Sequence, residues 1–80
     1  MNKADKLKAK VLAGQGYHNF SFADMTLLLK KLGFSSRQHG SHHFFTHPNI
    51  TEPVNIQAHG SQCKPYQIRQ IRDIINEHKL

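Results

Sequence analysis

The chain has 80 residues and a hydrophobic fraction of 38%, which allow one small domain with a single compact core and exclude a fully disordered chain. No apolar run approaches the ~20 residues of a membrane span, and the apolar stretch near the N-terminus is too short for a signal peptide, so we expect a cytoplasmic protein. The single cysteine, Cys63, excludes an internal disulfide framework. Eleven Lys and Arg against five Asp and Glu give a net charge of +6, which favours a polyanionic partner, most often a nucleic acid.

The N-terminal segment is basic and only weakly amphipathic. Residues 4–12 have the composition of a helix, but their apolar stripe is thin, with Leu7 and Val11 at i and i+4. We therefore expect a weakly held helix or a flexible arm over residues 1–19, ahead of a domain formed by residues 20–80.

The clearest helix signal follows this segment. Ser21 is a suitable N-cap, with Asp24 three residues later where a capping box places an acid. Gly33 stands where a left-handed residue ends a helix. Between these two signals the apolar residues recur at helical spacing, at Phe22, Met25, Leu28, Leu29 and Leu32.

A hairpin and a third strand are predicted next. Residues 34–39 and 42–47 are separated by Gly40-Ser41, a two-residue connection typical of a type II′ turn in which Gly supplies the positive φ. Residues 48–53 favour a longer loop, and residues 54–57 alternate apolar and polar as a third strand.

The last element is an amphipathic helix that Pro65 opens at its first position. Its apolar face contains Ile68, Ile71, Ile74 and Ile75. The order of helix, three antiparallel strands and helix predicts a two-layer α+β domain, with one face of the sheet open to solvent.

Histidine is unusually frequent. The chain has seven histidines, and five of them lie between His39 and His59. Imidazole can act as a base, an acid or a metal ligand. A zinc site is not expected, because His43 and His47 would stand ~13 Å apart along one strand face and no close pair of ligands is present.

The run from Gly40 to Phe45, Gly-Ser-His-His-Phe-Phe, followed by His47-Pro48, resembles the signature of HicA toxins of type II toxin–antitoxin modules. Residues 27–34 and 64–72 are similar to the family's elements in order and spacing. The resemblance implies a fold similar to a double-stranded-RNA-binding domain, cleavage of mRNA, and silencing by a HicB antitoxin. It also implies that the first histidine of the motif, His42, carries catalysis. No cofactor is expected, because RNA carries its own nucleophile and no metal cluster is visible in the sequence.

The chemistry of RNA suits this assignment. A base that takes the proton of a 2′-OH lets that oxygen attack the adjacent phosphorus, and imidazole is suited to this step near neutral pH. The negative charge that develops requires cations. The candidate RNA-binding cations are Arg37, Lys64, Arg69 and Arg72.

The residues alone leave three alternatives open. His43 is the rival of His42, because successive strand residues point to opposite faces and the buried face is not evident. His39 would lie opposite His42 in the hairpin, where its protonated form would favour neutral His42. Arg69 would, in the structural alternative, pair with Asp73 on a solvated helix face.

Three functions compete. The first is a metal-independent endoribonuclease toxin. The second is a non-catalytic RNA-binding module on the same scaffold. The third is a protein-interaction domain whose basic face binds an acidic partner.

Overall fold

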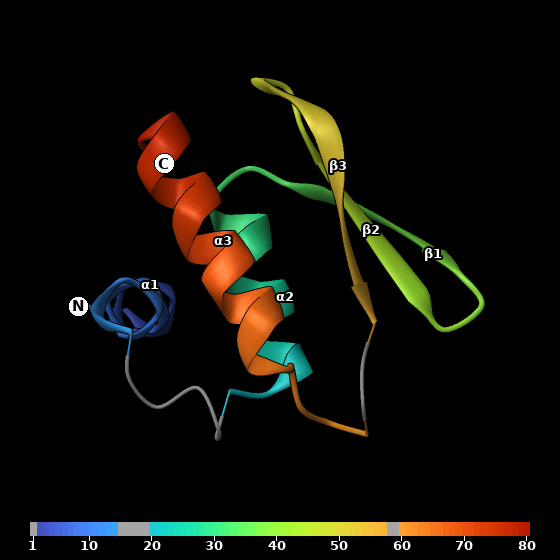
Figure 1. Ribbon diagram of the computed structural model, residues 1–80, viewed down its shortest axis with the longest axis horizontal. Helices are drawn as coiled ribbons and strands as arrows, with labels where there is room; N and C mark the ends of the chain where they lie inside the picture. Colours follow the sequence, from blue (N-terminus) through green and yellow to red (C-terminus); the bar gives the residue numbers. More distant parts are fainter. Residues whose placement is uncertain (1, 15–19, 58–59) are drawn as a thin grey trace.

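The computed structural model describes residues 2–14, 20–57 and 60–80 (Figure 1). The α+β class and the predicted order of helix, three antiparallel strands and helix are confirmed, with one further helix at the N-terminus. The elements are α1 (Lys3–Ala13), α2 (Phe22–Lys31), β1 (Ser35–His39), β2 (His42–His47), β3 (Ile50–Gln57) and α3 (Pro65–His78).

The predicted starting signals of both main helices are present. The Ser21 side chain accepts a hydrogen bond from the Asp24 N–H at 3.0 Å, which satisfies one free donor at the start of α2. Pro65 occupies the first turn of α3. After α2, Gly33 has a φ of +104°, a value that side chains with a Cβ rarely adopt.

The sheet has the order β1-β2-β3, and both pairs are antiparallel. Gly40 has a φ of +61°, and His39 faces His42 across the two-residue turn, as predicted. The predicted loop over residues 48–53 is wrong from residue 50 onward, because β3 already begins at Ile50. Pro53 lies inside β3, which is an edge strand, so its missing N–H removes no hydrogen bond to a neighbouring strand.

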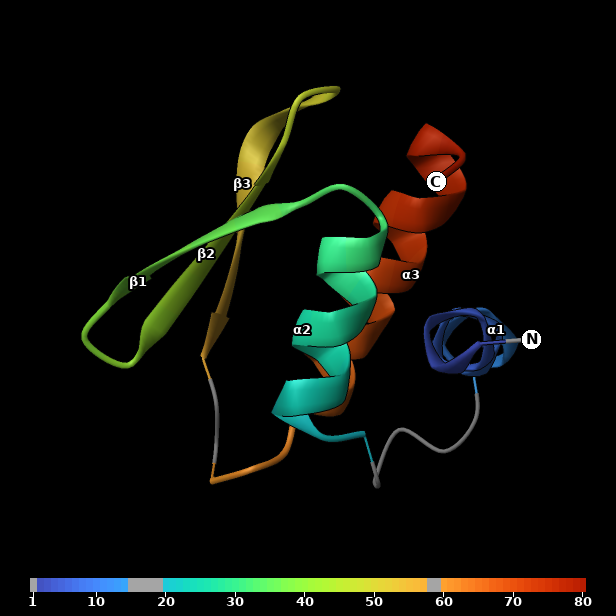
Figure 2. The same cartoon turned by 180° about the vertical axis from the view of Figure 1, so that it is seen from behind.

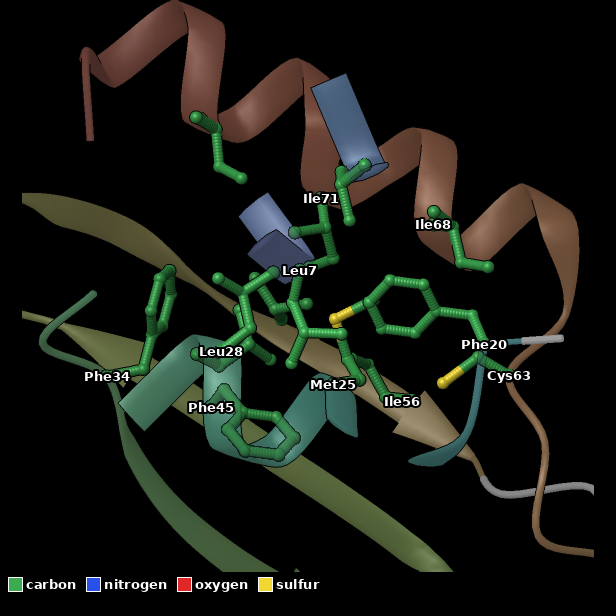
Figure 3. Packing of buried hydrophobic residues seen from close by; sticks show 14 residues of the cluster. Leu7, Phe20, Met25, Leu28, Phe34, Phe45, Ile56, Cys63, Ile68 and Ile71 are labelled. Carbon is green, nitrogen blue, oxygen red and sulfur yellow. The ribbon is translucent and has the colours of Figure 1, made fainter. Parts of the chain in front are cut away.

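The hydrophobic core fills the space between one face of the sheet and the helices α2 and α3 (Figure 3). The sheet contributes Phe45, Val54 and Ile56, which alternate with outward-pointing residues along β2 and β3. None of the helices in the described part of the chain covers the opposite face of the sheet (Figures 1 and 2). The sheet therefore has a helix-covered face and an open face.

Helix α1 packs on the side of α2 and α3 away from the sheet (Figure 2). Leu7 and Val11, the two residues of the thin stripe, are buried in the core. The Lys3 ammonium lies 3.2 Å from the Asp24 carboxylate, and the Lys10 ammonium lies 5.3 Å from the centre of the Phe20 ring. Of the two alternatives predicted for this segment, the helix is therefore confirmed as α1 and the flexible arm is wrong for it, while residues 15–19 lie outside the described residues.

Candidate functional site

The packing of β2 separates the two rival histidines. Phe45 is buried in the core, so the side chains that alternate with it, His42 and Phe44, point to the open face. His43 shares the helix-covered face with Phe45, and its ring lies 4.5 Å from the ring of Phe22 at the start of α2. The face that the sequence left undecided is thus determined by the core.

His42 is exposed and sits beside two other rings. Its imidazole stacks on Phe44 with ring centres 6.4 Å apart and an angle of 27° between the planes. His39, its partner across the hairpin, meets the edge of the same Phe44 ring at 5.8 Å. Neither ring nitrogen of His42 bonds another described residue. Both nitrogens are therefore available to a substrate.

His47 has a different environment from the other histidines of β2. The Asn49 N–H donates to its Nδ1 at 3.1 Å, so Nε2 carries the proton and donates to the Leu32 carbonyl at 3.1 Å. Its ring also packs against Phe34 at 5.0 Å. His47 therefore joins the end of α2 to the sheet, a structural role that its sequence position did not signal.

Two of the four predicted RNA-binding cations lie near the His42 end of the sheet. Arg37 is directly opposite Phe44 on β1, so its side chain emerges on the open face. Lys64 precedes α3, and its backbone N–H donates to the buried Gln67, whose amide donates to the carbonyl of Gln57. Gln57 is the β3 partner of His42, so this chain of hydrogen bonds ties the start of α3 to the strand beside His42.

The other two cations belong to α3, which packs on the helix-covered face. Arg69 is exposed there, and Arg72 is half-buried with its Nε 3.7 Å from the Asp73 carboxylate. The structural alternative, in which Asp73 pairs with Arg69, is therefore wrong in its partner. The structure brings Arg37 and His39 together with His42 on the open face and leaves Arg69 and Arg72 on the layer behind it.

Comparison with known proteins decides the family. The model of the HicA toxin of bacterial toxin–antitoxin systems matches residues 22–77, from the start of α2 to near the end of α3. The chain belongs to the HicA toxin family. It is therefore the toxin of a bacterial toxin–antitoxin pair, and the family implies an antitoxin partner. Helix α1 lies outside the matched residues. A search of curated proteins and a search of solved structures gave no match, so the similarity to a double-stranded-RNA-binding domain stays a prediction.

The open face of this HicA family member is hollowed next to His42, a feature that sequence reasoning missed. The groove has a volume of about 430 Å³. The one sequence signal for this groove is that residues 42 and 44, two apart on a strand, point to the same face of the sheet. Its walls include Ser35, Arg37 and His39 from β1, Phe44 and Thr46 from β2, and Pro53 from β3.

Cys63 belongs to the core of the toxin. Its side chain is buried, and burial raises the pKa of the thiol to about 11, because the charged thiolate loses its hydration. Its sulfur contacts the Ser21 carbonyl at 3.8 Å, so it helps to hold the start of α2. Among the described residues no three His, Cys, Asp or Glu side chains gather as a metal site, and His59 of the predicted cluster lies outside them. Within the same part of the chain no helix is long and apolar enough to cross a membrane.

Proposed function

We propose that this HicA family toxin is a cytoplasmic, metal-independent endoribonuclease that cleaves mRNA with His42 as general base. The observation that carries the proposal is the position of His42, whose exposed imidazole lies on the open face of a basic domain and forms no hydrogen bond with the described residues. His43 and His47 are packed against helix residues and are less accessible.

The reaction uses the nucleophile of the substrate. His42 takes the proton of a ribose 2′-OH, and O2′ forms a bond to the adjacent phosphorus while the bond from phosphorus to O5′ breaks. The departing O5′ takes a proton from His39 or from water. The products are a 2′,3′-cyclic phosphate and a 5′-hydroxyl end. One positioned imidazole supplies on the order of 10²- to 10⁴-fold acceleration.

The cations act in two ways. Arg37 stands on the open face and offers a planar, permanently charged group to the phosphate under attack. Lys64 borders the same end of the sheet, while Arg69 and Arg72 extend the positive surface onto α3 and attract the rest of the strand. Every one of these groups binds phosphate, and none transfers a proton in the proposed step.

The substrate itself provides the first test. A short RNA is compared with the same RNA carrying 2′-deoxyribose at every position that the toxin cleaves. We expect fragments with 2′,3′-cyclic phosphate ends from the first and no cleavage of the second, with unchanged rates in EDTA. A preparation of the His42→Ala variant controls for contaminating nucleases. Cleavage that EDTA abolishes and added metal restores would falsify the proposed mechanism.

The second candidate function, a non-catalytic RNA-binding module, is supported by the groove beside Phe44 and by the net charge of +6. Its signature is salt-dependent RNA binding by a protein that leaves every RNA intact. The same preparations distinguish the two, because the module binds RNA equally well with or without His42.

Silencing follows from the same surface. We propose that a HicB-like antitoxin covers His42 and presents acidic groups to at least one of Arg37, Lys64, Arg69 and Arg72, over an interface of roughly 1,600 Å². The antitoxin should protect His42 from diethylpyrocarbonate, with the modified histidines located by mass spectrometry. His43 serves as the internal reference in the same digest. A complex in which His42 remains reactive and RNA still binds would place the inhibition elsewhere.

A further inference from the structure

The groove on the open face lies beside His42, the proposed general base, and of its lining residues only His39 takes part in the proposed proton transfer. Its lining combines the Phe44 ring, the Arg37 guanidinium and the His39 imidazole with Pro53 and small polar side chains, and Phe44 is half-buried rather than covered. Because β1 and β2 are paired in register, Arg37 and Phe44 are direct neighbours across the two strands.

We propose that this groove binds an unpaired nucleobase of RNA, stacked on Phe44, with the adjacent phosphate on Arg37. The inference rests on the proposed function and adds its substrate class, which is single-stranded RNA. Aromatic side chains that stand on an open sheet bind bases in this way, since every base presents a π-face.

The surroundings of Phe44 hold its ring ready for a base. His39 meets its edge at 5.8 Å with an angle of 70°, and His42 lies beside it at a nearly parallel angle of 27°. A base on Phe44 therefore brings the ribose of the neighbouring nucleotide to His42. Base-paired RNA cannot use this contact, because its bases are already stacked on one another inside the helix.

The charge of the open face suits a polyanion. Arg37 lines the groove, and the acidic residue of the sheet, Glu52, alternates with Pro53 along β3 and so points away from the groove. The remaining acidic residues are all on helices, at Asp5, Asp24, Asp73 and Glu77. An acidic or purely apolar protein segment would leave either the ring or the guanidinium unmatched, whereas a nucleotide satisfies both.

The experiment exploits the absence of tryptophan from the sequence. The Phe44→Trp variant gains a single indole in the groove, and a base that stacks on it quenches its fluorescence. The matched control is Leu12→Trp, at an exposed position of α1 on the far side of the helices. Both are made together with His42→Ala so that the RNA stays intact, which a gel verifies.

We expect a 12-nucleotide unstructured RNA to quench the Phe44→Trp emission and to leave the Leu12→Trp emission unchanged. The duplex of the same sequence should bind at least about tenfold more weakly. Phe44→Leu should weaken binding of the single strand about tenfold in fluorescence anisotropy, because it keeps apolar bulk and loses the ring. Arg37→Gln should make the plot of log binding constant against log salt concentration less steep by about one unit, the change expected for the loss of one phosphate contact.

Two results would overturn the proposal. One is RNA binding, seen by anisotropy, that leaves the Phe44→Trp emission unchanged; the other is a duplex that binds as tightly as the single strand. Failure of the proposed cleavage is distinguishable, because quenching then persists in a protein with His42 that leaves RNA whole. A Phe44→Leu variant that does not fold removes only that measurement, since the tryptophan readout is independent of it.

Discussion

The two faces of strand β2 carry the same types of side chain, a histidine and a phenylalanine each, but one face is open and the other packs against the helices. His42 and Phe44 point to the open face, and His43 and Phe45 point to the helices. Phe45 is 1% exposed and packs in the core, whereas Phe44 remains half-buried on the open face. A shift of one residue in the pairing of this strand would exchange the groove for the core.

This difference teaches that position along the strand, rather than residue type, decides which of these side chains pack against the helices and which meet solvent. An imidazole packed on Phe22 stabilises the fold, while the same group one residue earlier meets solvent. A variant on the open face that mainly lowers stability, or one on the helix-covered face that mainly lowers cleavage, would contradict this comparison.

The largest expected effect is on cleavage, and it concerns the two adjacent histidines. His42→Ala should lower the rate by at least about 10²-fold and leave the unfolding free energy within about 0.5 kcal/mol of wild type. His43→Ala should retain most activity and lose about 1 kcal/mol of stability with its contact to Phe22. Initial cleavage rates and urea unfolding of both variants provide the test. If His43→Ala were inactive but fully stable, catalysis would belong to the helix-covered face, and the assignment of His42 as the general base would be wrong.

Sequence alone could not make this distinction. Both residues of each adjacent pair, the two histidines and the two phenylalanines, are of one type, so the usual alternation of apolar and polar residues is absent from β2. The alternation in β3, with Val54 and Ile56 apolar, would have decided the face if the register between β2 and β3 had been known. That register includes an irregularity between Phe45 and His47, which no turn motif announces.

Other elements were more accessible to prediction, in proportion to how local their signals are. The Ser21 cap and the helix start at Pro65 depend on neighbouring residues and are confirmed. The start of β3 was misplaced because Pro53 signals a loop unless the strand is at an edge. The docking of α1 was missed because two apolar residues suffice only when α2 and α3 provide a complementary surface.

The next effect concerns stability and compares the two phenylalanines. Phe45→Ala removes a fully buried ring and should cost about 3–5 kcal/mol, a large part of the stability of so small a domain. Phe44→Ala should cost about 1 kcal/mol or less, since its ring already meets solvent. Urea unfolding followed by circular dichroism measures both.

Phe45→Leu provides a measurable version where the alanine variant does not fold, because it keeps most of the buried volume. Equal losses at residues 44 and 45 would contradict the assignment of faces.

A smaller difference in stability is expected between substitutions at two glycines, Gly33 between α2 and β1 and Gly40 in the turn between β1 and β2. Gly33→Ala should cost about 1–3 kcal/mol, because Gly33 has a φ of +104° and a Cβ there would lie 3.1 Å from Nε2 of His47. Gly40, at the hairpin turn, also has a positive φ, but no atom of the described residues lies within 4 Å of the Cβ that Gly40→Ala would add, so this substitution should cost less.

A double-mutant cycle isolates the steric part. Adding His47→Ala should relieve some of the cost of Gly33→Ala and none of the cost of Gly40→Ala. Strictly additive losses in the first pair would mean that backbone strain alone explains the effect.

The smallest effect tests how completely the helix-covered side excludes water. Burial raises the pKa of Cys63 from 9.0 to about 11, so the folded protein holds the thiol proton more tightly than the unfolded chain. The resulting contribution to stability is fully present below pH 9 and is lost as the pH rises towards 11. The loss amounts to about 1 kcal/mol at pH 10. Lysine and tyrosine titrate in the same range, so the quantity to measure is the difference in unfolding free energy between wild type and Cys63→Ala. That difference should be constant from pH 6 to 8 and shift against the wild type above pH 9. A difference that stays flat to pH 10 would show that water reaches the thiol, and that the contrast between the two faces is weaker than the packing implies.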